Sequence, residues 1–321
     1  MSFSSQFLLA GPEAILAGAA LLLLVWGAYL GRSTAFTAAS IVALLAAAFV
    51  AVVGPQGVAF KGAFVHDQAS AFCKAALYIF SAFAIPLGEK WFAKRGEAKF
   101  EYPVLILIAA LGMGMMVSAG DLISLYIGVE LHSLALYVLA AFRRDDAKGS
   151  EAGLKYFVLG ALSSGLLLYG SSLVYGFAGS TRFDEIATVV QAGAGHGGVL
   201  FGLVFLMCGL AFKVSAAPFH MWTPDVYEGA PTPVVGFFAA APKLAAMVMF
   251  ARVLGDAFPG AVDQWRQVLV VIGIFSAAVG AFGGLTQGNL KRLWAYSSIA
   301  NIGYALIGLA VGGESGVQSM L

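Results

Sequence analysis

The residues in this chain most able to do chemistry are two lysines in successive apolar segments. Lys213 lies near the end of one apolar run and Lys243 lies about ten residues into the next, with Pro218 and Pro242 close by. A lysine in hydrocarbon costs about 2.5–3.5 kcal/mol on insertion scales, so two of them beside helix breakers require a functional reason. Conduction of ions or protons is the commonest such reason.

The prolines predict that the helix carrying Lys213 is discontinuous. Pro218 ends its apolar run, and Pro224, Pro231 and Pro233 follow within a short distance. Proline lacks an N–H donor and clashes with the preceding turn, so the freed carbonyls at membrane depth must face protein or water. A lysine at such a break is well placed to meet water. The competing interpretation is that both lysines extend their ammonium groups to the membrane surface.

A carboxylate, Glu130, lies in the middle of another apolar segment. Ser133 and Tyr137 follow it at spacings of three and seven residues, so the three side chains share one face of a helix. Carboxylates inside membranes are rare and usually functional, which favours a role in ion or proton transfer. The alternative is a structural ion pair or a protonated, hydrogen-bonded glutamate.

Two further groups are candidates for the same pathway. Lys155 lies about one turn inside its segment, after Glu151, and could equally extend toward the inner surface. His220, in the sequence PFHMW, could titrate in a relay or be a hydrogen-bonded structural histidine at the helix break. The sequence leaves both alternatives open.

Other ionisable groups in apolar surroundings have simpler predicted roles. Lys74 stands near the start of its segment and is predicted to extend to the membrane surface. His132 points away from Glu130 around the helix, which predicts a structural role. Asp225 and Glu228 are predicted to stabilise the N-terminus of the helix that resumes after the break, because acidic side chains favour that end.

The composition is that of a membrane protein. Of the 321 residues, 60% are hydrophobic and 11% are charged, and the mean hydropathy is +0.88, whereas soluble domains have about 45–50% apolar and 25% charged residues. The 40 glycines suit closely packed transmembrane helices. The net charge of +1 gives no basis for nucleic-acid binding. Cys73 and Cys208 lie in apolar runs without metal-ligand spacing, so packing is their predicted role and no metal site is expected.

Apolar segments of about 20 residues, the length needed to cross the hydrocarbon, predict about ten spans. They lie near residues 13–30, 34–53, 69–87, 103–120, 121–142, 153–177, 199–216, 233–255, 266–286 and 290–311. No soluble domain fits between them. The polar stretches 54–68 and 179–198 are expected to hold a short hairpin or a surface helix at most. No lysine or arginine precedes Arg32, which predicts a retained first span rather than a signal peptide.

Lysine and arginine are distributed unevenly over the predicted loops. With the N-terminus outside, the inside loops collect Arg32, Lys90, Lys94, Arg95, Lys99, Arg143, Arg144, Lys148, Lys291 and Arg292. The outside loops keep only Lys61 and Arg182, with Arg252 and Arg266 near span ends. The positive-inside rule therefore predicts that the N-terminus faces the periplasm or its equivalent.

A short internal similarity favours an inverted repeat. Residues 119–122, AGDL, open the fifth span, and residues 287–290, QGNL, open the tenth. One span is predicted to start outside and the other inside, so the related segments run in opposite directions, as in the inverted repeats of transporters. The match is short, and chance explains it about as well.

Longer motifs resemble a known family. The lysine of GLAFK, the run PFHMWTPDVYEGAPTPV and the lysine of APK are similar to the antiporter-like membrane subunits of respiratory complex I. YIGVELHSLALYVL matches their glutamate-bearing span and KRLWAYSSIANIGYALIGL a later one, so the resemblance covers essentially the whole chain. The run VYEGAP favours the subunit N branch. Sodium/proton antiporter subunits and proton-pumping hydrogenases belong to the same superfamily.

The resemblance implies an all-α transmembrane helical bundle with antiporter-like inverted repeats and a broken helix near Pro218. Within one membrane domain, residues 1–102 would be N-terminal spans, 103–255 the five-helix first repeat, and 256–321 the start of the second. That family usually has several more spans and a second lysine in the second repeat, so the second repeat is expected to be truncated here. It also commonly has a histidine where this chain has Asn301, so no titrating role is expected there.

By the same resemblance, Glu130 is the carboxylate paired with Lys213, and Lys243 is a central lysine of the proton path. Lys155 and His220 would belong to the hydrated part of that path. Burial lowers the pKa of a lysine and a nearby carboxylate raises it. Opening the contact between Glu130 and Lys213 would therefore push Lys213 to pass its proton to Lys243, and closing it would reload Lys213.

The predicted function is that of a proton-translocating membrane subunit of an NADH–quinone oxidoreductase in the cell inner membrane. The sequence has no GxGxxG nucleotide loop and no iron–sulfur cysteine cluster. No cofactor is therefore expected in this chain, and NADH, FMN, iron–sulfur clusters and quinone would belong to partner subunits. The expected partners are the other membrane subunits and the lipid bilayer. Two alternatives remain: a subunit of a sodium/proton antiporter or membrane hydrogenase, and a structural membrane scaffold.

Overall fold

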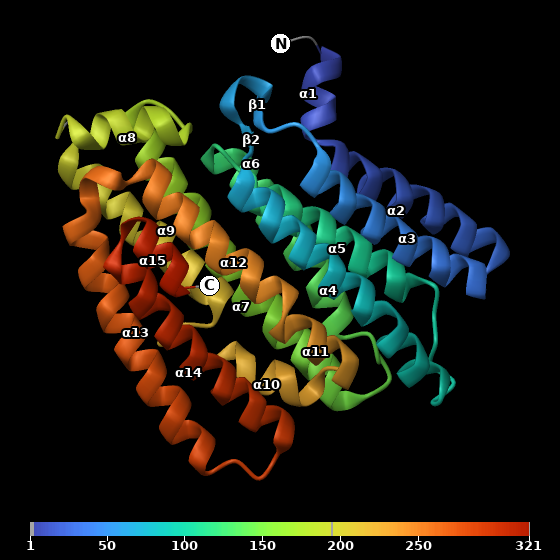
Figure 1. Cartoon of the computed structure of the whole chain (residues 1–321). Coiled ribbons are helices and arrows are strands. Elements are labelled where there is room, and N and C mark those ends of the chain that lie inside the picture. The colour runs from blue at the N-terminus through green and yellow to red at the C-terminus, as the bar shows by residue number, and fades with distance from the viewer. Residues whose placement is uncertain (1–2, 194, 321) are drawn as a thin grey trace. The chain divides into compact units, whose positions relative to one another are not determined.

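Helices form almost all of the structure, a computed structural model that describes residues 3–193 and 195–320 (Figure 1). Within that range, sheet structure is confined to one two-stranded hairpin. The all-α fold expected from the sequence is confirmed.

The predicted membrane spans correspond to observed helices. Nine of the described helical segments are long and apolar enough to cross a membrane. They are α2 (Gly11–Leu30), α3 (Thr34–Val53), α4 (Gln68–Ala93), α6 (Leu122–Ala140), α7 (Ala147–Ala178), α9 (His196–Val214), α11 (Thr232–Ala239) with α12 (Ala241–Arg252) and η2 (Val253–Ala257), η3 (Pro259–Ala261) with α13 (Val262–Leu285), and α14 (Leu290–Val311). The remaining predicted span, near residues 103–120, corresponds to α5 (Glu101–Val117), which is apolar but only 17 residues long.

Polar residues fix where two of these helices begin. The side chain of Asp121 accepts a hydrogen bond from Ser124 N at 2.6 Å at the start of α6, and Asn289 accepts one from Lys291 N at 2.9 Å at the start of α14. Asp121 and Asn289 are the third residues of the similar sequences AGDL and QGNL. Helix capping alone accounts for that similarity, so the inverted repeat stays a prediction.

The two polar stretches hold small elements, as predicted. β1 (Gly57–Ala59) and β2 (Phe64–His66) form an antiparallel hairpin joined by η1 (Phe60–Gly62). In the second stretch, α8 (Phe183–Gln191) lies across the end of its neighbouring helices (Figure 1). The short helices α1 (Phe3–Leu9), α10 (Trp222–Gly229) and α15 (Gly313–Met320) complete the described elements.

The chain forms two compact units. Unit 1 comprises Met1–Asp146 and Ala230–Ala245, and unit 2 comprises Ala147–Gly229 and Ala246–Leu321. The boundaries expected from the repeats, at residues 102 and 255, follow a different criterion and stay a prediction.

In unit 1, α5 packs against α2, α4 and α6. The backbones of α5 and α6 come close because glycines face each other: a Cβ atom at Gly112 would lie 2.4 Å from His132 N, and one at Gly128 would lie 2.8 Å from Met116 N. This contact buries His132, which is 4% exposed. It also fixes the position of α6, the helix that carries Glu130.

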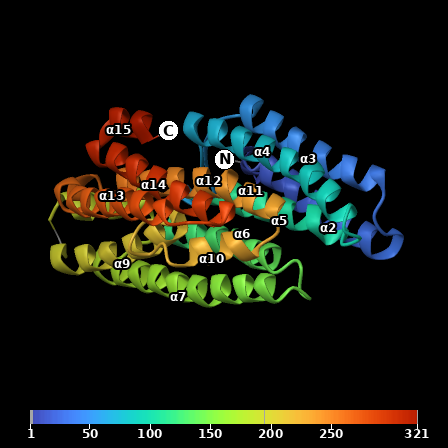
Figure 2. The same ribbon diagram turned by 90° about the horizontal axis from the view of Figure 1, so that it is seen from below.

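In unit 2, glycines allow two further pairs of helices to approach closely. A Cβ atom at Gly170 of α7 would lie 2.6 Å from Leu206 N of α9, and one at Gly280 of α13 would lie 2.4 Å from Ala300 N of α14. The short helix α10 contacts both α7 and α14 and is seen between them in Figure 2. Side chains of α10 can therefore reach both helix pairs.

The prediction for Lys74 is wrong, because this lysine does not extend to the surface. Its side chain is fully buried, and Nζ lies 2.6 Å from Oε1 of Glu13, the third residue of α2. The ring of Phe64, on the hairpin, lies with its centroid 4.5 Å from the same nitrogen. Burial is possible because a carboxylate and an aromatic ring from distant parts of the chain meet the ammonium group.

Candidate functional site

The helix carrying Lys213 is interrupted near Pro218, as predicted. α9 ends one residue after Lys213, and the next residue, Ser215, has left-handed backbone with φ of 66°. Ser215 N donates to Phe212 O at 3.0 Å and Ala216 N donates to Ala211 O at 2.8 Å, which is the hydrogen-bond pattern of a Schellman helix end. Lys213 therefore lies in the last turn of α9, where the helix dipole favours a cation.

Side chains of unit 2 satisfy the backbone groups at this break. Ala217 N donates to Ser276 Oγ of α13 at 2.8 Å, and Trp222 Nε1 donates to Phe212 O at 3.1 Å. The chain resumes as α10 at Trp222. Irregular backbone at membrane depth is stable only where protein or water supplies such partners.

His220 lies in the turn between α9 and α10 and is partly buried. Its backbone carbonyl accepts a hydrogen bond from Thr223 N at 2.9 Å. Burial lowers the pKa of His220 below its ordinary value of 6.5, although a hydrogen bond with the Pro218 backbone acts in the opposite direction. The imidazole is therefore neutral at neutral pH.

A second break precedes Lys243. α11 ends at Ala239 and α12 begins at Ala241, and Ala240 between them has a non-helical backbone with φ of −105° and ψ of −90°. Lys243 is the third residue of α12 and is 7% exposed. Each of the two lysines therefore lies beside an interruption of its helix.

Glu130 lies near the middle of α6, on the face that the spacing predicted. Tyr126 and Tyr137 are close enough to interact electrostatically with its carboxylate, and Ser133 forms a hydrogen bond with Tyr137. Oε1 of Glu130 is buried and has no hydrogen-bond partner within residues 3–193 and 195–320. Glu130 and Lys243 belong to unit 1, and Lys155, Lys213 and His220 belong to unit 2.

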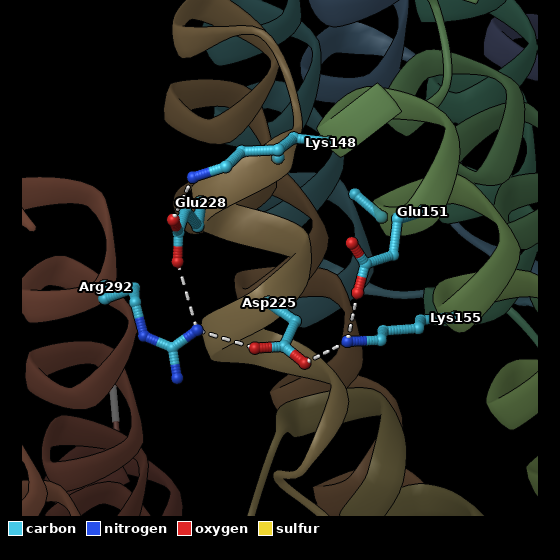
Figure 3. Close-up of a pocket in the computed structure, with 8 residues that line it drawn as sticks. Lys148, Glu151, Lys155, Asp225, Glu228 and Arg292 are labelled. Atoms are coloured by element: carbon cyan, nitrogen blue, oxygen red, sulfur yellow. Dashed lines mark hydrogen bonds and ion pairs between the residues drawn. The ribbon is translucent and has the colours of Figure 1, made fainter. Parts of the chain in front are cut away.

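Lys155 belongs to a network of six charged side chains in unit 2 (Figure 3). Lys155 Nζ lies 2.7 Å from Asp225 Oδ2 and 2.7 Å from Glu151 Oε1. Asp225 is shared with Arg292, whose Nη1 lies 2.6 Å from Oδ1. The same Arg292 atom lies 3.1 Å from Glu228 Oε2.

The network continues to Lys148, whose Nζ lies 2.9 Å from Glu228 Oε1. These side chains line a pocket of about 170 Å³, and three helices supply them: α7, α10 and α14. The charges of Lys148, Lys155 and Arg292 balance those of the three carboxylates. The pocket is therefore polar but electrically neutral, which suits water better than a charged ligand.

The neighbouring cations lower the pKa values of the two carboxyl groups of α10, Asp225 and Glu228. Partial burial acts to raise the pKa of Asp225, but hydrogen bonds from Lys155 and Arg292 outweigh it, so the pKa lies below its ordinary value of 3.8. Hydrogen bonds from Lys148 and Arg292 lower the pKa of Glu228 below 4.5. Both groups are carboxylates at neutral pH.

These contacts revise the prediction for α10. Asp225 lies in the first turn, as expected, but Asp225 and Glu228 bind cations on α7 and α14 rather than only stabilising a helix end. The sequence analysis missed Arg292 and Lys148 as members of the site and counted them only as loop charges. The available signal was Arg292 itself, a guanidinium that follows Lys291 in the first turn of a membrane-length helix.

The structure contains no group of three or more His, Cys, Asp or Glu side chains that could hold a metal ion, within residues 3–193 and 195–320.

Sequence comparison relates the chain to respiratory membrane proteins. The family model "NADH:quinone oxidoreductase/Mrp antiporter, TM" matches residues 119–321. NADH-quinone oxidoreductase subunit N of Caulobacter sp. (strain K31) is 70% identical over 326 residues, which cover 100% of this chain and 67% of that protein. The corresponding protein of Rhodobacter capsulatus is 54% identical over 321 residues, covering 99% and 67%. The chain thus spans about two thirds of the length of the curated relatives it matches.

Solved structures show the same fold. A chain of respiratory complex I from Thermus thermophilus superposes with a TM-score of 0.79 at 35% identity, over 92% of this chain and 64% of that one. A chain of the Mrp complex from Dietzia sp. superposes with a TM-score of 0.82 at 24% identity, over 98% and 60%. The second likeness concerns the fold alone.

Proposed function

This chain belongs to the NADH:quinone oxidoreductase/Mrp antiporter membrane family, and we propose that it moves protons across the membrane as a subunit N-type component of an NADH-quinone oxidoreductase. One observation carries the proposal above all. Lys213 and Lys243 each lie beside an interruption of an apolar, membrane-length helical segment. Irregular backbone within an apolar span needs polar partners from protein or water, and such polar surroundings let a proton reach and leave an amine.

The chemistry is reversible protonation of the two amines. Each lysine holds a proton as an ammonium group and passes it on by becoming a neutral amine. The family resemblance makes Glu130 the carboxylate that would set the proton affinity of Lys213, since a carboxylate close to an ammonium group stabilises it and withdrawal of the carboxylate favours proton release. Lys243 then receives the proton, and water restores the charge on Lys213.

The network around Lys155 is the proposed entrance to this route. Lys155 is 40% exposed at its side chain and lies at the polar pocket lined by α7, α10 and α14. Neutral His220, in the turn before α10, can accept a proton through its unprotonated ring nitrogen. Both groups would pass protons toward Lys213.

The energy for transport comes from redox chemistry in partner subunits. The relatives at 70% and 54% identity are named NADH-quinone oxidoreductase subunit N, and we infer that this chain joins other membrane subunits of such a complex. NADH, FMN, iron–sulfur clusters and quinone then belong to those partners, and no redox centre belongs to this chain. The excess of lysine and arginine in alternate loops supports an inner-membrane location with the N-terminus outside.

Substitution of Glu130 tests the proposal. In membrane vesicles containing the full-length subunit, NADH-driven proton uptake per assembled complex should fall strongly in Glu130→Gln, which keeps the shape and removes the charge. Glu130→Asp should retain part of the activity, because a carboxylate remains within side-chain reach. Equal and undiminished uptake in the two variants would show that the carboxylate is not needed.

A further inference from the structure

Unit 1 contains a cluster of buried ionisable side chains that the proposed proton path does not use. Glu13 on α2, His66 on β2, and Lys74 and Tyr78 on α4 are 7%, 2%, 0% and 0% exposed. Lys74 Nζ lies 2.6 Å from Glu13 Oε1, and Tyr78 Oη donates to the same oxygen at 3.4 Å. The cluster therefore has a carboxylate at its centre.

The backbone of α5 leaves space for this cluster. A Cβ atom at Gly114 would lie 2.1 Å from Tyr78 Oη and 2.8 Å from Glu13 Oε1. Any other residue at this position would displace both groups. Gly114 thus allows α5 to pack beside the polar cluster without contributing a side chain to it.

The hairpin closes the cluster at one end of unit 1, which we call the hairpin end. The ring of Phe64 covers the Lys74 ammonium group, and His66 lies at the end of β2. Val65 N donates to Ser118 O at 2.8 Å, so the hairpin is bound to the segment that leads into α6. Asp67, the next residue after His66, is partly exposed.

The hydrogen bond of His66 defines which ring nitrogen can accept a proton. Nε2 lies 3.1 Å from Ala51 O, and because a carbonyl oxygen can only accept, Nε2 carries the hydrogen. Burial, and then the charge of Lys74, lower the pKa of His66 below 6.5, so the ring is neutral at neutral pH. Nδ1 is then a bare acceptor.

Two acceptor atoms of the cluster lack a hydrogen-bond partner within the described part of the chain: Glu13 Oε2 and His66 Nδ1, both buried. A buried ion pair gains little over apolar residues of the same volume unless its remaining lone pairs are satisfied. A purely structural pair therefore explains this arrangement poorly. A carboxylate oxygen and an imidazole nitrogen are instead the atoms that take up a proton.

Other ionisable groups also face the cluster. Asp67, at the start of α4, interacts electrostatically with His66, and Cys73 of α4 interacts with Tyr78. From α5, the facing residue is Gly114, and from α3 it is the carbonyl of Ala51. The charge of the cluster is thus governed by Glu13, Lys74 and His66, with the partly exposed Asp67 next to His66 in the chain.

We propose that Glu13, His66, Lys74 and Tyr78 form a proton-binding site through which translocated protons exchange with water at the hairpin end of unit 1. The proposal rests on the proposed proton transport and adds a site outside the Lys213 and Lys243 route. A proton from water binds Nδ1 of His66 and passes to Oε2 of Glu13. The product is a neutral carboxyl group beside the Lys74 ammonium. Return of the proton through His66 to water restores the carboxylate, and no electron is transferred.

The first test measures protonation of Glu13 directly. Infrared difference spectra of the purified, assembled complex, recorded as the pH is lowered, should contain the carbonyl band of a protonated carboxyl group that is missing in Glu13→Gln. Identical spectra of the wild type and the variant would overturn the proposal. This measurement does not require proton transport to be active.

The second test separates proton transfer from structural pairing. The double variant Glu13→Gln with Lys74→Met removes both charges together and leaves neither partner buried alone, so folding should be preserved. NADH-driven proton uptake per assembled complex should fall about tenfold or more, as expected when a proton-transfer group is lost. Uptake at the wild-type rate would overturn the proposal and leave a structural ion pair.

A matched control uses another ion pair of unit 1. Arg32 Nη1 lies 3.6 Å from Glu89 Oε2, and both groups are partly exposed, away from the hairpin. Arg32→Gln with Glu89→Gln should leave proton uptake unchanged, and an equal loss in this control would overturn the assignment to Glu13. Glu130→Gln is measured in parallel, because normal uptake in that variant contradicts the proposed function and not the protonation of Glu13.

Discussion

At the scale of single residues, Lys243 is a lysine that is almost fully buried inside a membrane-length helical segment. It is the third residue of α12, is 7% exposed, and lies three positions after the non-helical Ala240. Within its helix, the next charged residue is Arg252. A neighbouring group of the same helix therefore cannot take over its proton.

The substitution Lys243→Arg separates a proton relay from a fixed positive charge. Guanidinium effectively never releases its proton, so a relay should lose most of its NADH-driven proton uptake in Lys243→Arg, as in Lys243→Ala. Uptake is measured in vesicles and normalised to assembled complex, with Lys94→Arg, at an exposed position, as the matched control. Near-normal uptake in Lys243→Arg together with loss in Lys243→Ala would establish a fixed charge and exclude transfer through this residue.

At the scale of elements, the short helix α10 is positioned by charges on both sides. Asp225 and Glu228 bind Lys148 and Lys155 of α7 and Arg292 of α14. Partly exposed ion pairs each contribute only about 0–1 kcal/mol. Because Arg292 contacts both carboxylates, it is nevertheless the residue that ties α10 to α14.

The network makes acid stability depend on Arg292. The pKa values of Asp225 and Glu228 lie below their ordinary values of 3.8 and 4.5. The unfolded chain therefore binds protons first as the pH falls, so the network stabilises the fold above about pH 4–5 and this contribution is lost below it. In Arg292→Gln both pKa values should rise toward the ordinary ones.

Melting temperatures of the detergent-solubilised protein between neutral and acidic pH measure this effect. Arg292→Gln should melt lower than the wild type at neutral pH and lose less stability on acidification. Arg143→Gln, which breaks the comparable pair with Glu97 in unit 1, is the control and should keep the wild-type acid slope. Parallel pH curves of Arg292→Gln and the wild type would contradict the role assigned to Arg292.

At the scale of the whole molecule, helices that are long and apolar enough to cross a membrane form most of the described part of the chain. The chain covers about two thirds of relatives that are named as subunits of an oxidoreductase. The charged network and the two helix breaks lie among apolar spans, where polar side chains are rare and mostly functional. We therefore expect this chain to work in an assembly with partner subunits that carry out redox chemistry.

Purification of the full-length protein in mild detergent tests that setting. Flavin and iron–sulfur proteins should co-purify with it, and vesicles containing the assembly should take up protons when NADH is supplied. Exchange of sodium for protons without NADH or quinone, together with co-purification of antiporter components only, would instead establish a sodium/proton antiporter subunit.

Much of the fold could be predicted from the sequence because its cause is local. A span requires about 20 apolar residues in succession, and proline interrupts a helix. Neighbouring residues therefore predict both the ends of the apolar runs and the interruption near Pro218. The shared face of Glu130, Ser133 and Tyr137 follows in the same way from helical periodicity. The sequence by itself therefore determined the spans, the broken helix and the exceptional placing of its lysines.

Only the tertiary structure decided which charged groups meet. Glu13 and Lys74 pair across α2 and α4, and Arg292 meets Asp225 across 67 residues of sequence. Composition and periodicity state that a helix is apolar, but they do not state which helix lies beside it or how far one is shifted along the other. An ion pair forms only if the two helices are positioned along each other to within a few ångströms. The burial of Lys74 and the membership of Arg292 in the site were therefore fixed by packing between helices that are distant in the sequence.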